Sequence, residues 1–427
     1  MRHLVLALAF AAVASTSLLY TACGGDDTSA ASADGGTTSD DASGVDALAK
    51  DGSAPAAPAC RVAAFADSPC AKSLEECERR PLAVPIGEEY PFGITVDDEF
   101  VYWLVQKPSE GSGASQGLGE SNLWRVPRID APSPPPRVLL ARGQERATLL
   151  AREGVDIYWI VAATADGGVK STLRRLAGAK TAKACSTASC DPTEDVVSLD
   201  GEVEKLLHVS EGVFFAAMSD GTITRIARSG AGSGAFTATK VATTSRTPSL
   251  ATDGTDVFAG GETFGSILRI PGSNGAPGNL VTLPAEIVDA GPDAKADGAV
   301  PPVPEAGPPD GFTLLTTDCA SVFGVRDGNE LWRTSLESPS VEPMAGGADA
   351  GSLWALYQDV AVDERFLWLA SASEGVFRVA HDGKRLTGPL EQVYKGGVWA
   401  LAIDDEGVYW GEHRSPGILG YVHFQKK

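Results

Sequence analysis

A short pattern of apolar and polar positions returns seven times along the chain. Each copy has an apolar stretch, a turn with an acidic residue or glycine, then an apolar residue and an aromatic one. The clearest copy runs from Ile403 to Trp410, and others run from Val96 to Trp103 and from Ala151 to Trp159. The stretch after the turn is nearly all apolar, which is typical of a strand covered on both faces. The pattern therefore predicts paired strands deep in an all-β fold.

A second apolar stretch follows each copy, usually with an arginine. These stretches are Leu123–Val126, Leu173–Leu176, Ile223–Ile226, Ile267–Ile270, Leu331–Arg333, Val376–Val379 and Leu419–Val422, the last of which has no arginine. They recur about every 43 to 50 residues, except across one interval of 64 residues. That interval holds a Pro-, Ala- and Asp-rich insertion at 289–311, without which the spacing is regular. Such a period predicts the blades of a β-propeller.

Four strands can be placed in most units. In the second unit they are Leu149–Ala151, Val155–Val161, Thr172–Leu176 and Val196–Leu199. The seventh unit ends after its third strand, near Phe424, and an unused strand, Leu82–Val84, precedes the first unit. Strands from the two ends would together close the ring and remove its exposed edges. We therefore predict a seven-bladed propeller over residues 81–427, with six or eight blades as alternatives.

The Val-Tyr-Trp core and the Leu-x-Arg-Val that follows it resemble the YWTD-type β-propeller repeats over about residues 81–424. No copy has Thr-Asp after Tyr-Trp, and those families usually have six blades. Propellers serve both as binding platforms and as enzymes, so the resemblance implies a fold more than an activity.

The N-terminus predicts an export signal at 1–22. Arg2 and His3 precede a continuous apolar run from Leu4 to Ala14, which is too short for a spanning helix. The stretch from Leu19 to Cys23 resembles the lipobox of bacterial lipoproteins. The resemblance implies cleavage before Cys23 and acylation of that residue, whereas ordinary cleavage after Ala22 is the alternative. Several acyl chains would anchor the protein durably in a membrane. Gly24 stands where Asp would favour the inner membrane, so we expect the outer membrane of the cell envelope.

The segment 23–58 is rich in Gly, Ala, Ser, Thr and Asp and has almost no large apolar side chain. It cannot bury enough surface to offset its ordering entropy, so it predicts a disordered acidic tether. A Cys-containing segment at 59–80 follows it. The chain has seven cysteines, and six remain after Cys23: Cys60, Cys70, Cys77, Cys185, Cys190 and Cys319. An even remainder in an exported chain favours disulfides. Cys185 and Cys190 suit a local bridge, the other four allow three pairings, and Cys319 should pair with the N-terminal region.

Three sets of repeated residues are candidates for chemistry. The acids are Asp97, Glu153, Asp253, Asp318, Asp363 and Asp404, the strand aromatics are Trp103, Trp159, Trp368 and Trp410, and each repeat arginine lies on a third strand. We expect the acids to accept main-chain hydrogen bonds in separate turns. We expect the arginines to lie between blades, on aromatics and paired to acids, and the tryptophans to fill the space between blades. The alternatives are a catalytic or metal site where the acids converge, an anion-binding ring formed by the arginines, and stacking of carbohydrates on the tryptophans.

The histidines after the signal, His208, His381, His413 and His423, have no metal-like spacing and suggest no Ser-His-Asp order, and the last two are expected at the surface. We predict no catalytic residues, no metal and no cofactor. The net charge of −21 argues against nucleic-acid partners.

Two long loops should share one face of the ring: Lys107 to Ser121 and the 289–311 insertion. The leading hypothesis is a monomeric, lipid-anchored platform that binds an envelope protein or senses a signal without catalysis. The alternatives are an enzyme with a central-funnel active site (a lyase, glycan hydrolase or dehydrogenase) and a protein that binds envelope glycans.

Overall fold

The computed structural model of the chain describes residues 63, 79–82, 90–108, 118–128, 136–165, 168–186, 190–230, 234–244, 248–261, 266–273, 276–282, 311–326, 330–345, 357–413 and 422–426. Every regular element among them is a β-strand. In this part of the chain no helix has the length and apolar character needed to cross a membrane. Cys23, the predicted tether, Cys60, Cys70, Cys77 and most of the predicted insertion lie outside the described residues.

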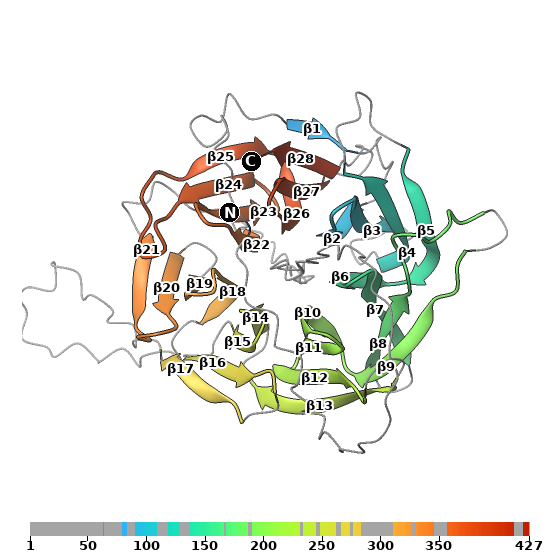
Figure 1. Cartoon of the computed structure of the whole chain (residues 1–427), viewed down its shortest axis with the longest axis horizontal. Coiled ribbons are helices and arrows are strands. Elements are labelled where there is room, and N and C mark those ends of the chain that lie inside the picture. The colour runs from blue at the N-terminus through green and yellow to red at the C-terminus, as the bar shows by residue number, and fades with distance from the viewer. Residues whose placement is uncertain are drawn as a thin grey trace, which may run out of the picture.

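The strands form seven four-stranded antiparallel sheets, the blades of a β-propeller (Figure 1). Blade 1 holds β2 (Tyr90–Val96), β3 (Phe100–Pro108), β4 (Leu118–Pro127) and β5 (Val138–Glu145). Blade 2 holds β6 (Ala147–Glu153), β7 (Asp156–Ala165), β8 (Gly168–Leu176) and β9 (Glu194–Asp200). Blade 3 holds β10 (Val203–Ser210), β11 (Val213–Met218), β12 (Thr222–Arg228) and β13 (Phe236–Thr243). Blade 4 holds β14 (Pro248–Thr252), β15 (Asp256–Gly261), β16 (Ser266–Pro271) and β17 (Gly278–Thr282).

Blade 5 holds β18 (Phe312–Thr317), β19 (Ser321–Arg326), β20 (Glu330–Ser335) and β21 (Val341–Ala345). Blade 6 holds β22 (Tyr357–Val362), β23 (Phe366–Ser371), β24 (Gly375–Ala380) and β25 (Glu391–Lys395). Blade 7 holds β26 (Gly397–Ile403), β27 (Gly407–His413), β28 (Val422–Lys426) and β1 (Arg79–Pro81). The seven blades and the four strands of blade 2 confirm the predicted architecture. The predicted loop from Lys107 to Ser121 is shorter than expected, because both of its ends belong to β3 and β4.

The ring closes with strands from both ends of the chain, as predicted. β1 pairs with β28 and lies at the outer edge of blade 7, where Figure 1 shows it beside β28. The predicted closing strand Leu82–Val84 was wrong by three residues, since the strand is Arg79–Pro81. Leu82 follows the strand, is buried, and donates its N–H to the carbonyl of Val422. Proline is tolerated at Pro81 because an edge strand leaves N–H groups unpaired.

The core lies between blades and is built from the second strands. All residues of β15, β19 and β23 are buried, as expected for strands covered on both sides. One apolar cluster joins Val101 and Trp103 of blade 1 to Tyr409 and Phe424 of blade 7. Neighbouring blades therefore share their cores around the ring.

The ring has two faces with different connections. The turn face carries the tight turns between the first and second strands of each blade. The loop face carries the connections from second to third strands and from one blade to the next. Each innermost strand begins at the loop face and ends at the turn face, so a residue's place along that strand tells which face it approaches.

Candidate functional site

The repeated acids hold the turns of their own blades in five cases. In each, one carboxylate oxygen accepts main-chain N–H bonds from the residues two and three positions later. These acids are Asp97, Asp253, Asp318, Asp363 and Asp404, with donor–acceptor distances from 2.6 to 3.1 Å. The acids lie in separate blades and serve separate turns, so the predicted structural role is confirmed for these five.

Glu153 departs from this pattern. Blade 3 has Ser210 where the other blades have an acid, and its turn instead uses the acid of blade 2: the N–H of Gly212 donates to Glu153 Oε1. The other oxygen, Oε2, accepts from Arg228 Nη2 of blade 3 at 2.9 Å and from the hydroxyl of Tyr158 at 2.8 Å. One longer side chain therefore ties two blades together.

Strand aromatics bind the second oxygen of several acids. The Tyr102 hydroxyl donates to Asp97 Oδ2 at 2.9 Å, and Trp368 Nε1 donates to Asp363 Oδ2 at 2.9 Å, in each case from five residues later. Burial, followed by the nearby Asp97 carboxylate, raises the pKa of Tyr102 far above its ordinary value. Burial and Glu153 do the same for the pKa of Tyr158. These phenols therefore stay neutral donors, and the repeated Tyr five residues after an acid is the sequence signal that could have predicted the bond.

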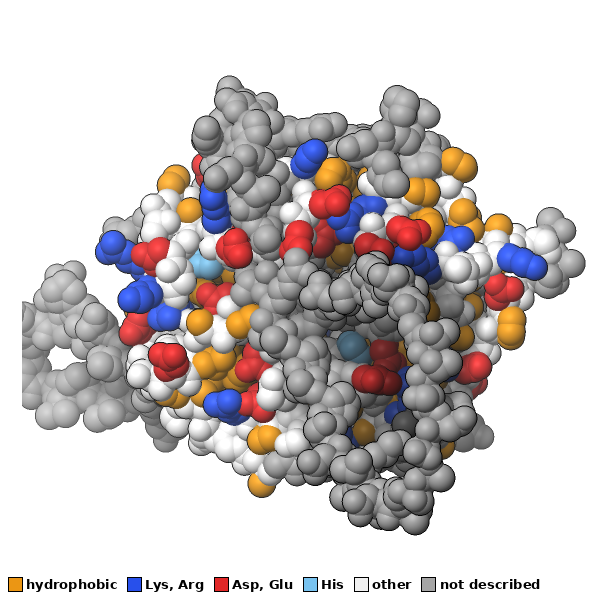
Figure 2. All heavy atoms as spheres, viewed as in Figure 1, with side chains coloured by type: hydrophobic (Ala, Val, Ile, Leu, Met, Phe, Trp, Pro, Cys, Tyr) orange, Lys and Arg blue, Asp and Glu red, His pale blue; other side chains and the backbone are white. Residues whose placement is uncertain are grey.

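Cations at the ends of third strands clamp one blade to the preceding one. Arg128 of blade 1 lies 3.0 Å from Asp404 and 2.7 Å from Glu406 of blade 7, across the seam of the ring. Arg228 of blade 3 binds Glu153 of blade 2, as described above. On the face shown in Figure 2, acidic and basic side chains likewise lie next to one another around the ring. Arg128, Arg228 and their acidic partners therefore hold neighbouring blades together.

The repeat arginines match their expected packing in part. Arg378 lies 4.4 Å from the Phe366 ring centroid and binds Glu391, and Arg175 binds Asp156. Arg125 lies over Phe100 but donates to the carbonyls of Ala179 and Lys180 instead of an acid. Arg269 binds Asp256 but is 46 % exposed, so it is not enclosed between blades. The arginines serve different partners in different blades and form no common anion-binding ring.

Trp103, Trp159, Trp368 and Trp410 are at most 1 % exposed. They fill space between blades, as predicted, and have no free face on which a sugar could stack.

The histidines occupy different environments. His381 is buried; its Nδ1 accepts from the N–H of Gly383, so Nε2–H donates to the carbonyl of Asp363. His423 was expected at the surface, but it is largely buried, lies 3.1 Å from Glu412 and stacks on Trp410. His208 packs against Phe214, and its buried Nε2 has no hydrogen-bond partner among the described residues. The side chain of His413 lies outside the described residues.

The local disulfide between Cys185 and Cys190 is present, as predicted. Cys319 is also disulfide-bonded. Among the described residues, no three His, Cys, Asp or Glu side chains form a group that could hold a metal ion.

A different set of residues lies on the innermost strands near the loop face. The innermost strand carries a β-bulge near its start in blades 1, 2, 3, 5, 6 and 7. Bulges redirect side chains and are frequent beside functional sites. Each of these six strands has a partly exposed side chain five positions before its turn acid or, in blade 3, before Ser210. We call these side chains the inner ring: Phe92, Thr148, Lys205, Thr313, Gln358 and Trp399. Their types differ from blade to blade, although the scaffold beneath them repeats. Sequence reasoning missed them because only the strand register places them together.

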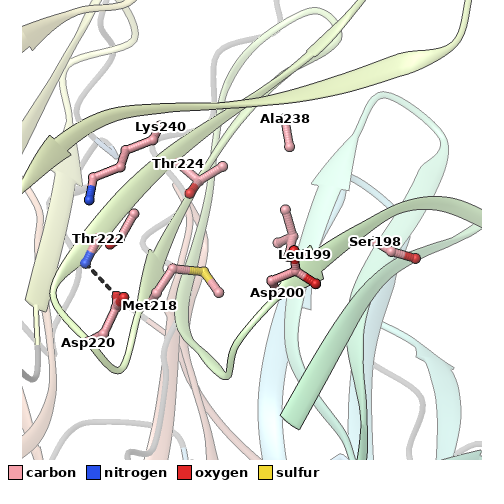
Figure 3. Close-up of a pocket in the computed structure, with 9 residues that line it drawn as sticks. All are labelled: Ser198, Leu199, Asp200, Met218, Asp220, Thr222, Thr224, Ala238 and Lys240. Carbon is pink, nitrogen blue, oxygen red and sulfur yellow. Dashed lines mark hydrogen bonds between the residues drawn. The ribbon is translucent and has the colours of Figure 1, made fainter. Parts of the chain in front are cut away.

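A groove opens at the perimeter between blades 2 and 3 (Figure 3). It has a volume of about 310 Å³ and is lined by Ser198, Leu199, Asp200, Met218, Asp220, Thr222, Thr224, Ala238 and Lys240. One wall is the end of β9, and the other is the face of β12 and β13, with Met218 between them. The Thr222 N–H donates to Asp220 at 2.8 Å (Figure 3). The groove reaches the loop face, where β9 ends and β12 begins.

No protein-family model matches the sequence, and neither does any curated protein. Several solved propellers are similar in structure at low identity. YCF48 from Cyanidioschyzon merolae is 12 % identical with a TM-score of 0.49, over 82 % of this chain and 98 % of that chain. The WD40 propeller domain of Doa1 is 9 % identical with a TM-score of 0.49, over 81 % and 96 %. BamB from Moraxella catarrhalis is 12 % identical with a TM-score of 0.43, over 78 % and 82 %.

Proposed function

We propose that the protein is a lipid-anchored platform of the bacterial envelope that binds a partner protein and catalyses no reaction. The anchor rests on the export signal and the lipobox-like stretch that ends at Cys23. The described turn-face acids and third-strand arginines bind turns or neighbouring strands and so make a rigid scaffold. Residues on such a scaffold are well placed to bind, and the groove between blades 2 and 3 is the observation that carries the proposal.

The groove suits an extended segment of a partner. β13 is the outermost strand of blade 3 and pairs only with β12 among the described strands. Ala238 and Lys240 line the groove from this strand and are exposed. An extended chain could pair with the free edge of β13 and place alternate side chains in the groove. Met218 would adapt to different side chains because its thioether chain is flexible.

The groove is tested with two matched variants. Ala238→Arg fills the groove, whereas Thr239→Arg adds the same side chain at a neighbouring exposed position that does not line it. The full lipoprotein is cross-linked in native envelopes and captured, and its partners are identified. We expect Ala238→Arg to lose a partner that Thr239→Arg retains. Equal recovery by both variants would remove the groove from the proposal.

The anchor is tested separately with Cys23→Ala. We expect the protein without the substitution to incorporate labelled fatty acid and to sediment with membranes. The variant should do neither and should recover less of the partner. Membrane sedimentation without fatty-acid incorporation would show that the protein is held by another means.

A further inference from the structure

The inner ring is chemically asymmetric. Phe92 of blade 1 and Trp399 of blade 7 are neighbours across the seam, with ring centroids 5.9 Å apart and planes inclined by 58°. Both rings are partly exposed, whereas the strand residues around them are buried. Aromatic rings held in this way offer a rigid apolar surface to a ligand.

Lys205 of blade 3 contributes a cationic group, in contrast to the apolar rings of Phe92 and Trp399. It forms no hydrogen bond or ion pair with the described residues, yet its side chain lies deep in the molecule and is partly exposed. This combination fits a side chain that reaches solvent through the centre of the ring. Burial lowers the pKa of Lys205, and the negative charges of Asp359 and Glu204 only partly counter that effect.

Asp359 accepts main-chain bonds from its own blade and from blade 7. Its Oδ1 accepts from the N–H of Val360 at 2.8 Å, and its Oδ2 accepts from the N–H of Leu401 in blade 7 at 2.6 Å. The second bond ties blade 6 to the strand that carries Trp399. The negative charge of Asp359 therefore acts on Lys205, although the described residues show no ion pair between the two side chains. An ammonium group in such a place is best stabilised by an anion that comes to it.

We propose that the inner ring binds a ligand that carries a carboxylate next to an apolar or aromatic group. The carboxylate would accept hydrogen bonds from the Lys205 ammonium, and the apolar body would pack on Phe92 and Trp399. Gln358, next to Asp359 on the same strand, adds an amide that can donate to or accept from the ligand. This site is distinct from the groove and goes beyond the proposed protein-binding function. The same chemistry is found in a small organic acid and at the C-terminus of a peptide that ends in an aromatic residue.

The test is calorimetric titration of the purified full lipoprotein in detergent. The probes are phenylacetate, its uncharged counterpart 2-phenylethanol, and acetate, which lacks the apolar body. A pentapeptide that ends in Phe and its C-terminal amide distinguish the two sources of carboxylate. We expect phenylacetate or the free-acid peptide to bind at least tenfold more tightly than its uncharged counterpart, and acetate to bind more weakly than phenylacetate.

The variants assign the binding to this site. Lys205→Met should weaken binding at least tenfold, Lys205→Arg should retain most of it, and Trp399→Leu should weaken it severalfold. Lys240→Met, which removes an exposed lysine from the groove, is the matched control and should bind as the unmodified protein does. Circular dichroism checks that each variant folds.

Equal affinity for charged and uncharged probes overturns the proposal, even if Lys205→Met does not fold. Absence of binding by every probe overturns it too, as does a folded Lys205→Met that binds normally. Ala238→Arg should leave this binding intact, so failure of the groove and failure of the inner ring are distinguishable.

Discussion

Glu153 illustrates how one residue can stabilise two blades. A shorter acid holds its own turn in five blades, but Glu153 reaches Gly212 and Arg228 of the next blade. Its side chain is 12 % exposed and that of Arg228 is 14 % exposed, so solvent screens the pair little. Removing one partner of a buried pair leaves the other charge without compensation, which is the costly case.

We therefore predict that Glu153→Ala lowers the free energy of unfolding by about 3 kcal/mol. Asp253→Ala is the control, because its carboxylate serves only its own turn in the bonds described. We expect that variant to lose about 1 to 2 kcal/mol. Urea denaturation followed by fluorescence measures both, and equal losses would show that the bond between blades adds nothing.

His208 predicts a pH dependence of stability. Burial lowers its pKa from 6.5 to about 4, and Arg152 and Arg228 act in the same direction, whereas Glu153 opposes them. In the unfolded chain the ring takes up a proton near pH 6.5, so between pH 6.5 and 4 the unfolded state binds more protons. Stability should therefore fall as the pH drops through this window, by about 3 kcal/mol in total, and His208 should add no further loss below pH 4.

The His208→Gln variant isolates this effect from the carboxylates that titrate in the same range. Its free energy of unfolding should fall less steeply between pH 6.5 and 4 than that of the unmodified protein. Parallel stability curves for the two proteins would show that His208 does not titrate as its burial requires.

At the scale of elements, the closing strand β1 has the weakest pattern in the sequence, yet its pairing with β28 closes the ring. β1 has three residues, yet it covers the edge of β28 through the pairs of Arg79, Arg80 and Pro81 with Gln425, Phe424 and His423. The outer strand of a blade needs no continuous apolar run, because it is not enclosed on both faces. The apolar pattern therefore pointed to Leu82–Val84, just past the true strand.

We predict that deleting the chain through Leu82 weakens the ring and exposes an edge for pairing with other molecules. The truncated protein should unfold at a lower urea concentration and associate as its concentration rises, as measured by light scattering. A shorter deletion, through residue 58, is the control and should stay monomeric. A stable monomer without β1 would mean that the third strand of blade 7 needs no cover.

The repeated elements were predictable because the same packing of apolar strands recurs in each blade and depends on residues of that blade. Apolar residues on both faces of the second strand, and an acid at the turn before it, are set by their own blade. The inner ring was not predictable, because a bulge shifts the register by one residue and thereby selects which side chain faces the axis. The bond from Glu153 to Gly212 was equally hidden, since it depends on Ser210 replacing an acid one blade away.

At the scale of the whole molecule, the attachment of the N-terminal segment suggests an orientation. Ala63 pairs with Asp363, and its carbonyl accepts from the N–H of Glu364, at the turn face of blade 6. If Cys23 is lipidated, the chain from the membrane arrives at the turn face, whereas the groove and the inner ring open on the loop face. If the 40 residues from Cys23 to Ala63 behave like the predicted tether, their typical span is roughly 35 Å. That span permits rotation but biases the turn face toward the membrane.

We predict that this bias is measurable with the lipoprotein in vesicles containing spin-labelled lipids. A fluorophore on Thr255→Cys, exposed in the turn of blade 4, should be quenched more than one on Thr243→Cys, exposed at the end of β13 near the loop face. The two sites are matched threonines, so the comparison cancels differences in labelling chemistry. Equal quenching would mean that the tether imposes no orientation. Stronger quenching at Thr243→Cys would place the groove against the membrane, where an envelope partner could not reach it, and would contradict the platform model as well as the orientation.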